Sequence, residues 1–291
     1  MNTIALDRSY SRMNTLFNSL LAFIAAATVI NGTPKSVGVT HSLVSEVKAI
    51  TPGQTFTVAL FLDHDETFHT YWKNPGTAGL ATSLNWTLPE GFKASPIQWQ
   101  VPEKVKMVIY EAYGYNSDAM LLVDITAPDT LPERVELKAK AVWMACGPEA
   151  KQCCNLGFQN LSLSLKTARE ATWDEEGRTR IAEARGRLPK PIDGWAQAAE
   201  RKGEQVILTV RNADGTRVPQ REGICFYSEL NHFTTLKNQE TKVEGSEITV
   251  TLPVADYAPR KLKKLVGLLF HPDGWAGSDG RKYMPVSLSL E

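Results

Sequence analysis

Short stretches in which apolar and polar residues alternate, separated by turn signals, set the strongest limit on the fold of this chain. The pattern runs from about residue 37 to residue 166 and is clearest over 56–62 and 135–141. A period of two residues is typical of strands with one buried face. Turn signals recur at Pro52-Gly53, Asn74-Pro75-Gly76, Pro89-Glu90-Gly91, Pro128-Asp129 and Leu131-Pro132. We therefore expect an antiparallel β-sandwich of immunoglobulin-like type over residues 36–166, with Trp72, Trp86, Trp99 and Trp143 in its interior.

A short helical connector and a second, smaller β domain are expected to follow the sandwich. Thr172-Trp173-Asp174-Glu175 has the form of a capping box, and good helix formers continue to Gly186. Pro189 and Pro191 end this segment, which we place at 167–192. Strand-like runs return at 206–210, 247–252, 265–270 and 286–290. They predict a sandwich-like domain over 193–291, so the whole chain is expected to be all-β.

The first 31 residues have the layout of a secretory signal. Arg8 and Arg12 precede an apolar run over 20–30, and a polar turn follows at 31–34. The run is shorter than the about 20 residues of a spanning helix. Ala25 and Ala27 form a small-x-small site, which predicts cleavage after Ala27. An uncleaved anchor is the alternative. An exported chain lies where disulfides persist, which affects the interpretation of its cysteines.

Charge and histidine content narrow the function classes. The 32 Lys and Arg balance 32 Asp and Glu, and no basic run stands out, so nucleic acid is not an expected partner. The five histidines are widely scattered and form no Ser-His-Asp or metal triad. His69, beside Tyr71, is interpreted as a semi-buried structural histidine. We expect no cofactor.

Three of the four cysteines, Cys146, Cys153 and Cys154, fall within nine residues in a connection between two predicted strands. Adjacent Cα atoms are about 3.8 Å apart, which would strain a bond between Cys153 and Cys154. Cys146 is therefore expected to pair with Cys153 or Cys154, leaving the other to pair with Cys225 or to stay free.

Spacing alone leaves several roles open for this cysteine group. A disulfide that only clasps the hairpin would contribute about 2–3 kcal/mol. Zinc is disfavoured because the paired short spacings and a nearby His are missing, whereas copper(I) could use thiolates with Met144 or Met107. No Cys-x-x-Cys opens a helix, so any thiol reactivity would have to come from exposure in a loop and from neighbours such as Lys151, opposed by Glu149.

A set of motifs over about 40–166 resembles the N-terminal domain of the DsbD family of thiol:disulfide interchange proteins, especially its suppressor-of-copper-sensitivity branch. The motifs are His69-Thr70-Tyr71-Trp72-Lys73-Asn74-Pro75-Gly76, Leu88-Pro89-Glu90-Gly91-Phe92, Tyr113-Gly114-Tyr115 and Trp143-x-x-Cys146. The resemblance implies an immunoglobulin-like periplasmic domain whose cysteine pair relays reducing equivalents. The family's Cys-x-x-Gly corresponds to Cys154-Asn155-Leu156-Gly157, so the resemblance implies a Cys146–Cys154 pair with Cys153 as an extra thiol.

The chain also departs from the family pattern. The loop between the paired cysteines is longer and contains Cys153. The family's cap loop corresponds to 110–114, and its shielding Phe would be Ala112, so Tyr113 or Tyr110 is expected to serve as the aromatic lid. No multi-helix membrane domain or thioredoxin-like domain is present in this sequence.

We accordingly predict a periplasmic thiol–disulfide exchange protein with Cys146 and Cys154 as its reactive residues. Its implied partners are thioredoxin-fold oxidoreductases and a separate multi-helix membrane electron donor. Whether the chain itself acts as a protein-disulfide reductase is left undecided by the sequence. The alternatives are a non-catalytic exported interaction module with a structural disulfide, and a copper(I)-binding protein.

Overall fold

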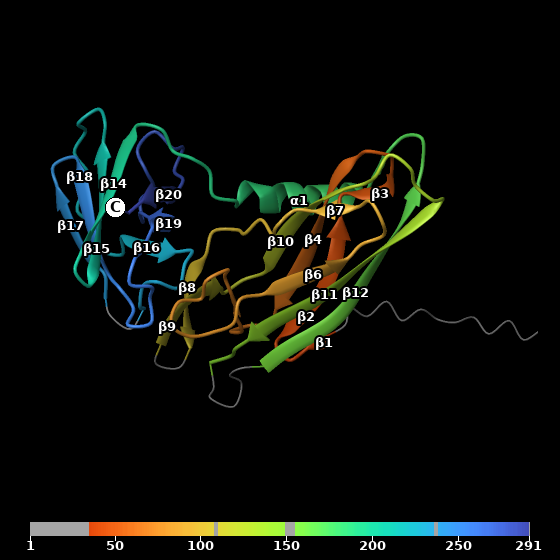
Figure 1. The fold of residues 1–291 in the computed structure, drawn as a ribbon, viewed down its shortest axis with the longest axis horizontal. Helices are drawn as coiled ribbons and strands as arrows, with labels where there is room; N and C mark the ends of the chain where they lie inside the picture. Colours follow the sequence, from red (N-terminus) through yellow and green to blue (C-terminus); the bar gives the residue numbers. More distant parts are fainter. Residues whose placement is uncertain (1–34, 108–109, 149–154, 236–237, 291) are drawn as a thin grey trace, which may run out of the picture. The chain divides into compact units, whose positions relative to one another are not determined.

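The computed structural model describes residues 35–107, 110–148, 155–235 and 238–290 (Figure 1). The predicted signal segment 1–31, with its cleavage site at Ala27, lies outside these residues, and so do Cys153 and Cys154. The chain from Thr33 onward forms one compact unit. Among the described residues, no helix combines the length and the apolar character needed to cross a bilayer.

Two five-stranded sheets pack face to face in the first half of the chain. In spatial order, the first sheet contains β1 (Lys35–Ser36), β2 (Val39–Ser45), β4 (Thr55–His64), β10 (Ala119–Thr126) and β7 (Lys93–Ala94). The second contains β13 (Thr172–Trp173), β3 (Val47–Ile50), β12 (Asn155–Thr167), β11 (Arg134–Ala145) and β6 (Ser83–Thr87). All pairings are antiparallel except the short parallel contact of β12 with β3.

The sequence alternation explains how these sheets share a core. Along β11, every second residue from Val135 to Ala145 is buried, while the residues between them face outward. Buried side chains from both sheets join one cluster that includes Leu60, Leu121 and Leu137. Trp72 and Trp143 are fully buried in it, and Trp86 and Trp99 pack against it. The interior positions predicted for Trp72 and Trp143 are confirmed, whereas Trp86 and Trp99 lie partly buried at the edge of the core.

A small three-stranded sheet lies beside the sandwich. It consists of β5 (Thr70–Tyr71), β9 (Tyr110–Tyr115) and β8 (Glu103–Met107), with β9 in the middle. Val105 pairs with Ala112, and Lys104 pairs with Tyr113. Because side chains alternate along a strand, these two pairs point to opposite faces of the small sheet.

Helix α1 (Glu175–Gly186) begins at a different cap from the one predicted. Asp174 is the N-cap, and its Oδ1 accepts a hydrogen bond from the Gly177 N–H at 3.0 Å. Thr172, predicted as the first residue of a capping box, instead belongs to β13 and pairs with Ala49. An Asp directly before two Glu residues is an equally good cap, and strand pairing engages the residues in front of it.

Two further sheets form the second β region. One contains β14 (Trp195–Lys202), β15 (Gln205–Asn212), β18 (Glu247–Pro253) and β17 (Glu240–Glu244), and the other contains β16 (Cys225–Ser228), β19 (Lys264–Phe270) and β20 (Tyr283–Ser289). Their buried residues form a second core that includes Leu208, Val250 and Leu269. Tyr227 and Leu268 instead join the core of the sandwich, so the two β regions share buried contacts.

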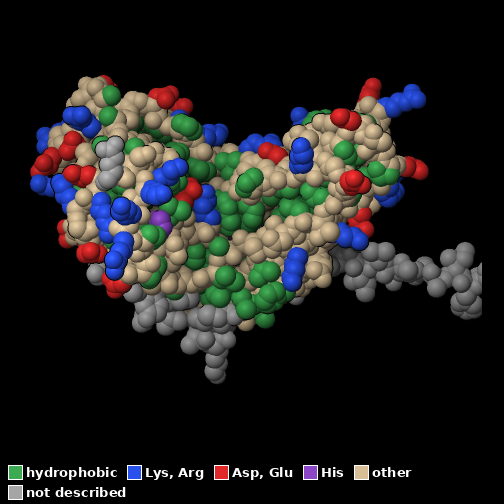
Figure 2. Space-filling view, in the orientation of Figure 1, with side chains coloured by type: hydrophobic (Ala, Val, Ile, Leu, Met, Phe, Trp, Pro, Cys, Tyr) green, Lys and Arg blue, Asp and Glu red, His purple; other side chains and the backbone are tan. Residues whose placement is uncertain are grey.

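The predicted all-β class is confirmed, and all four predicted strand runs of the second half fall on strands of this region. The boundaries 36–166, 167–192 and 193–291 stay a prediction. Figure 2 shows one face of the molecule, on which basic and acidic side chains are mixed rather than separated. This mixing agrees with the formal net charge of zero.

Candidate functional site

Cys146 directly follows β11, at the end of the long hairpin that β11 forms with β12. Its N–H donates to the carbonyl oxygen of His69, and the His69 N–H donates to the carbonyl oxygen of Cys146, both at 3.0 Å. The neighbouring Ala145 is buried in the sandwich core. Alternation along the strand therefore directs the Cys146 side chain to the outer face of the sheet.

The outer face is nevertheless covered at this point, because the small sheet packs over Cys146. Tyr71, Val105, Ala112 and Cys146 form one buried cluster, with Met144 against it. The Cys146 side chain is completely buried. The strands of the small sheet thus form a cap over the sulfur atom.

Two polar side chains, Tyr71 and His69, form a chain of contacts that ends at the sulfur atom. The Tyr71 hydroxyl donates to Cys146 Sγ at 3.1 Å, and His69 Nε2 lies 3.3 Å from the Tyr71 hydroxyl oxygen. Burial, together with the nearby His64, lowers the pKa of His69 from 6.5 to about 4. His69 is therefore neutral near pH 7, and it donates to Tyr71 when its Nε2 is the protonated nitrogen.

The hairpin register explains the glycine of the Cys-x-x-Gly motif. Gly157 lies directly opposite Trp143, whose ring is completely buried. A Cβ atom on Gly157 would lie 2.2 Å from Trp143 Cε2. Only glycine leaves room for the indole ring here, so this motif residue positions the hairpin that ends at Cys146.

The outer face of β12 carries apolar side chains close to the cysteine region. Leu156 is 49% exposed and Phe158 is 56% exposed. Farther along the same face, the side chains are the polar Asn160, Ser162 and Ser164. Exposed apolar residues grouped beside a candidate site are typical of protein contact surfaces.

The structure brings together only some of the predicted site residues. Ala112 packs with Cys146, as its assignment to the cap implies. Tyr113 lies on the opposite face, where its ring centroid is 4.8 Å from that of Tyr227. The side chain of Tyr110, and both Cys153 and Cys154, lie outside the described residues. The lid assignments and the cysteine pairing therefore stay predictions.

Tyr71 is the contact that sequence reasoning missed. His69 and Tyr71 are two residues apart, so their side chains share a face of an extended segment. That spacing was a usable signal, but only the long-range bridge between His69 and Cys146 brings both side chains to the cysteine.

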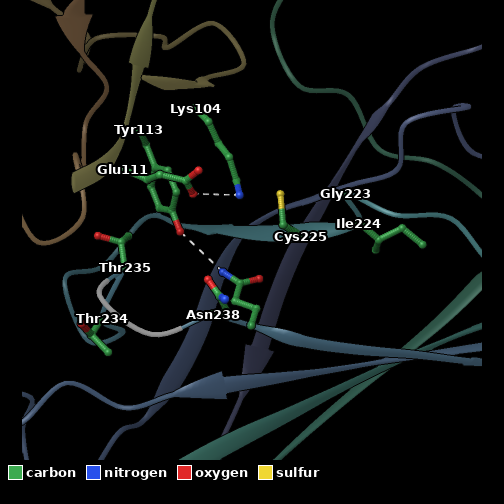
Figure 3. Close-up of a pocket in the computed structure, with 10 residues that line it drawn as sticks. Lys104, Glu111, Tyr113, Gly223, Ile224, Cys225, Thr234, Thr235 and Asn238 are labelled. Carbon is green, nitrogen blue, oxygen red and sulfur yellow. Dashed lines mark hydrogen bonds and ion pairs between the residues drawn. The ribbon is translucent and has the colours of Figure 1, made fainter. Parts of the chain in front are cut away.

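Cys225 occupies a different environment. It is partly buried on β16 and forms no disulfide with another described residue, and its alternative pairing with Cys153 or Cys154 involves residues outside the described part of the chain. Burial raises the pKa of its thiol, and Lys104 opposes this effect in part. Figure 3 shows Cys225 in a cavity together with Lys104 and Tyr113.

Fold and site together define the class: an immunoglobulin-like β domain with one cysteine, Cys146, at the end of a hairpin and beneath a small cap sheet. Residues 40–163 match the family model described as "Thiol:disulfide interchange protein DsbD, N-terminal". This part of the chain is similar to that domain family, and the resemblance noted in the sequence is confirmed.

One solved structure aligns over most of this chain, and a second aligns over less than half of it. The N-terminal periplasmic domain of ScsB from Proteus mirabilis aligns with a TM-score of 0.61 at 14% identity, covering 89% of this chain and 96% of that one. The Neisseria meningitidis DsbD N-terminal domain, in its reduced form, aligns with a TM-score of 0.25 at 11% identity, covering 45% and 90% of the two chains. A search of curated protein sequences found no match.

The comparison with ScsB establishes the fold across both β regions, whereas the family match identifies residues 40–163 as a thiol:disulfide interchange module.

Proposed function

We propose that this protein exchanges thiols and disulfides with partner proteins through Cys146 and Cys154. In the reduced protein, one thiolate attacks a sulfur of the partner's disulfide and releases the partner's other sulfur as a thiolate. The second cysteine then attacks the mixed disulfide, releases the reduced partner and leaves Cys146 bonded to Cys154. Two electrons pass to the partner, and a separate membrane donor must return them.

The observation that carries this proposal is the position of Cys146 in the family-matched hairpin. The last described pair of the hairpin is Ala145 with Asn155, and in the sequence Cys146 directly follows Ala145 while Cys154 directly precedes Asn155. Both backbone polar groups of Cys146 are bonded to His69. The side facing β12 is then a non-hydrogen-bonded position, where opposite Cα atoms are about 4.5 Å apart and suit a disulfide.

The proposed setting is the periplasm, reached through cleavage of the signal at residues 1–31. The proposed partners are thioredoxin-fold oxidoreductases, in keeping with the matched domain family. The exposed Leu156 and Phe158 supply apolar contact area next to the reactive pair. The Tyr71 hydroxyl donates a hydrogen bond to the sulfur of Cys146, and His69 Nε2 lies within hydrogen-bond distance of that hydroxyl.

Single-cysteine variants test the exchange. Reduced Cys146→Ser and Cys154→Ser proteins are mixed with a periplasmic thioredoxin-fold oxidoreductase in its disulfide form, quenched with acid and analysed by mass spectrometry. At least one variant should trap a mixed disulfide that the wild type resolves. Cys225→Ser, made as the control, should exchange like the wild type. If neither variant traps the partner, the exchange function is wrong.

The complete burial of Cys146 favours a second candidate, a non-catalytic module with a structural disulfide. Equilibration in dithiothreitol redox buffers separates the two functions. A structural bond should have a potential below about −300 mV, whereas a relay pair should lie higher. Mass spectrometry of the oxidised protein also identifies whether Cys153 or Cys154 pairs with Cys146.

A further inference from the structure

The β8–β9 strand pair, called the cap strand pair below, contacts two parts of the molecule with its two faces. On one face, Val105 and Ala112 pack against Cys146. On the other, Tyr113 contacts Tyr227 of β16 in the second β region. The same two strands therefore link the environment of the candidate redox cysteine to the second β region.

Hydrogen bonds reinforce the contact between Tyr113 and the second β region. The Tyr113 hydroxyl donates to the carbonyl oxygen of Phe226 at 3.4 Å. Gln239 Nε2 lies 3.5 Å from the Tyr113 hydroxyl and 2.7 Å from the Phe226 carbonyl oxygen. Burial raises the pKa of Tyr113, so the phenol stays protonated and remains a donor. These groups fix the outer face of β9.

A second tie lies at the start of the cap strand pair. The Tyr283 hydroxyl of β20 donates to the carbonyl oxygen of Pro102 at 2.6 Å, directly before β8 begins. Tyr283 also packs against Tyr227, with ring centroids 5.8 Å apart. Tyr227 and Tyr283 thus form one aromatic cluster in the second β region, and this cluster contacts β9 and the start of β8.

The intrinsic stability of the small sheet is low. Its third strand, β5, has only two residues, so most of the sheet is the β8–β9 pair, and an isolated pair of strands is marginally stable at best. A cavity of about 280 Å³ adjoins Tyr113, Lys104, Cys225 and Gln239, so the outer face is held at a few points rather than along its length (Figure 3). Such a restraint can be released without unfolding either core.

We propose that the second β region holds the cap strand pair against Cys146 and thereby limits access of thiol reagents and partner proteins to its sulfur. Tyr227 and Gln239 are the positioning residues, and they act through Tyr113. The inference deepens the proposed exchange function and rests on it for its biological meaning. It assigns a role to the part of the chain that lies outside the matched family domain.

The test measures how fast iodoacetamide alkylates Cys146 in the reduced full-length protein. Trypsin cleavage after Lys140 and Lys151 places Cys146 on a peptide without another cysteine, so mass spectrometry reports this residue alone. Tyr227→Leu should increase the alkylation rate about three- to tenfold, the range expected when one aromatic pair is lost. Tyr227→Phe keeps the ring and should restore the slow rate.

Two comparisons keep the result interpretable. Tyr257→Leu is the matched control, because Tyr257 is 58% exposed in the second β region and should leave the rate unchanged. Gln239→Ala, a milder change, should also raise the rate. The free energy of unfolding, measured in urea, gives the fraction of unfolded molecules and hence the alkylation rate expected from global unfolding alone. The measured alkylation rate of each variant must exceed this value.

Wild-type alkylation rates in both Tyr227→Leu and Gln239→Ala would overturn the restraint. So would a rate explained by global unfolding in both variants. Iodoacetamide needs no partner protein, so this experiment decides the restraint independently of whether exchange with an oxidoreductase is found.

Discussion

Gly157 is the residue at which the hairpin tolerates the least change. A methyl group there would lie 2.2 Å from Cε2 and 2.6 Å from Nε1 of the fully buried Trp143. We expect Gly157→Ala to lower the free energy of unfolding by about 1–3 kcal/mol, because overpacking forces a buried ring to move. Urea unfolding monitored by tryptophan fluorescence measures the loss.

Gly186 provides the matched control for this substitution. It is the last residue of α1, and a Cβ atom added there would meet no other atom within 4 Å. Gly186→Ala should be neutral or stabilising by up to about 1 kcal/mol, since alanine favours the helix. Equal effects at both glycines would contradict the packing argument for Gly157.

Tyr71 is expected to tune the redox potential of the Cys146 couple. Its hydroxyl donates to Sγ, and a reduced sulfur accepts such a bond better than a disulfide sulfur does. Loss of about 1.4 kcal/mol from the reduced form in Tyr71→Phe should make the potential more negative by about 30 mV. Dithiothreitol redox titration measures the shift.

Tyr115→Phe is a suitable comparison, because it removes another buried tyrosine hydroxyl from β9. Tyr115 donates to the carbonyl oxygen of Gln100 at 3.1 Å and is not in the cluster that surrounds Cys146. The redox potential of the Tyr115→Phe variant should equal that of the wild type. An unchanged or less negative potential in Tyr71→Phe would show that the hydroxyl does not stabilise the reduced sulfur.

At the residue scale, sequence reasoning succeeded where local pattern decides the environment. The predicted interior position of Trp143 follows from the alternation along its strand. The same alternation separates Ala112 from Tyr113, but it does not say which face meets the cysteine. That depends on how distant strands pack, and so the contact of Tyr71 with Cys146 could not be derived from spacing.

At the element scale, the outer face of β12 is predicted to affect exchange with a protein partner but not reaction with a small thiol. Leu156 and Phe158 are exposed beside the cysteine region. Serine at both positions should slow exchange with a thioredoxin-fold partner about tenfold, as loss of central apolar contacts does at interfaces. Reduction by dithiothreitol should stay at the wild-type rate, because that reagent needs no such surface.

Stopped-flow fluorescence can follow both reactions in the same preparations. Val37→Ser is the control, since Val37 is 58% exposed and lies outside the hairpin. A double variant that slows both reactions equally would point to altered sulfur chemistry rather than to a docking surface.

The elements themselves were predictable to different degrees. Long alternating strands such as β11 and β15 follow from their sequence, because burial on one face determines the pattern. The small sheet was not predicted as a separate layer. Its β5 has two residues, and its pairing with β9 joins positions more than forty residues apart, which no local signal records. Helix α1 was predicted, but its cap was displaced because β13 pairs with β3.

At the scale of the whole molecule, all five histidines share one property. Burial lowers the pKa of each of them from 6.5, as seen for His41, His64, His69, His232 and His271. His41 is completely buried against Trp143, and neither of its ring nitrogens has a hydrogen-bond partner among the described residues. The folded protein therefore holds its histidines neutral where the unfolded chain would protonate them.

This difference predicts a loss of stability in acid. Because each folded pKa lies below the unfolded value, the histidine contribution to stability is complete above about pH 6.5 and declines as the pH falls toward the folded values. For His69 the decline continues to about pH 4. Unfolding in this window should take up protons, up to one for each histidine, and the free energy of unfolding should fall between pH 7 and pH 4.

The His41→Phe variant isolates the contribution of one histidine to the acid sensitivity. The wild type and the variant have the same carboxylates, so the carboxylate contribution is equal in both. The phenyl ring fills a similar volume beside Trp143 and cannot bind a proton, so the variant should lose less stability than the wild type between pH 7 and pH 4. Urea titrations at half-unit pH intervals give both curves. Parallel curves would mean that His41 is protonated equally in the folded and unfolded chain, and its burial would then have no part in the acid sensitivity of the fold.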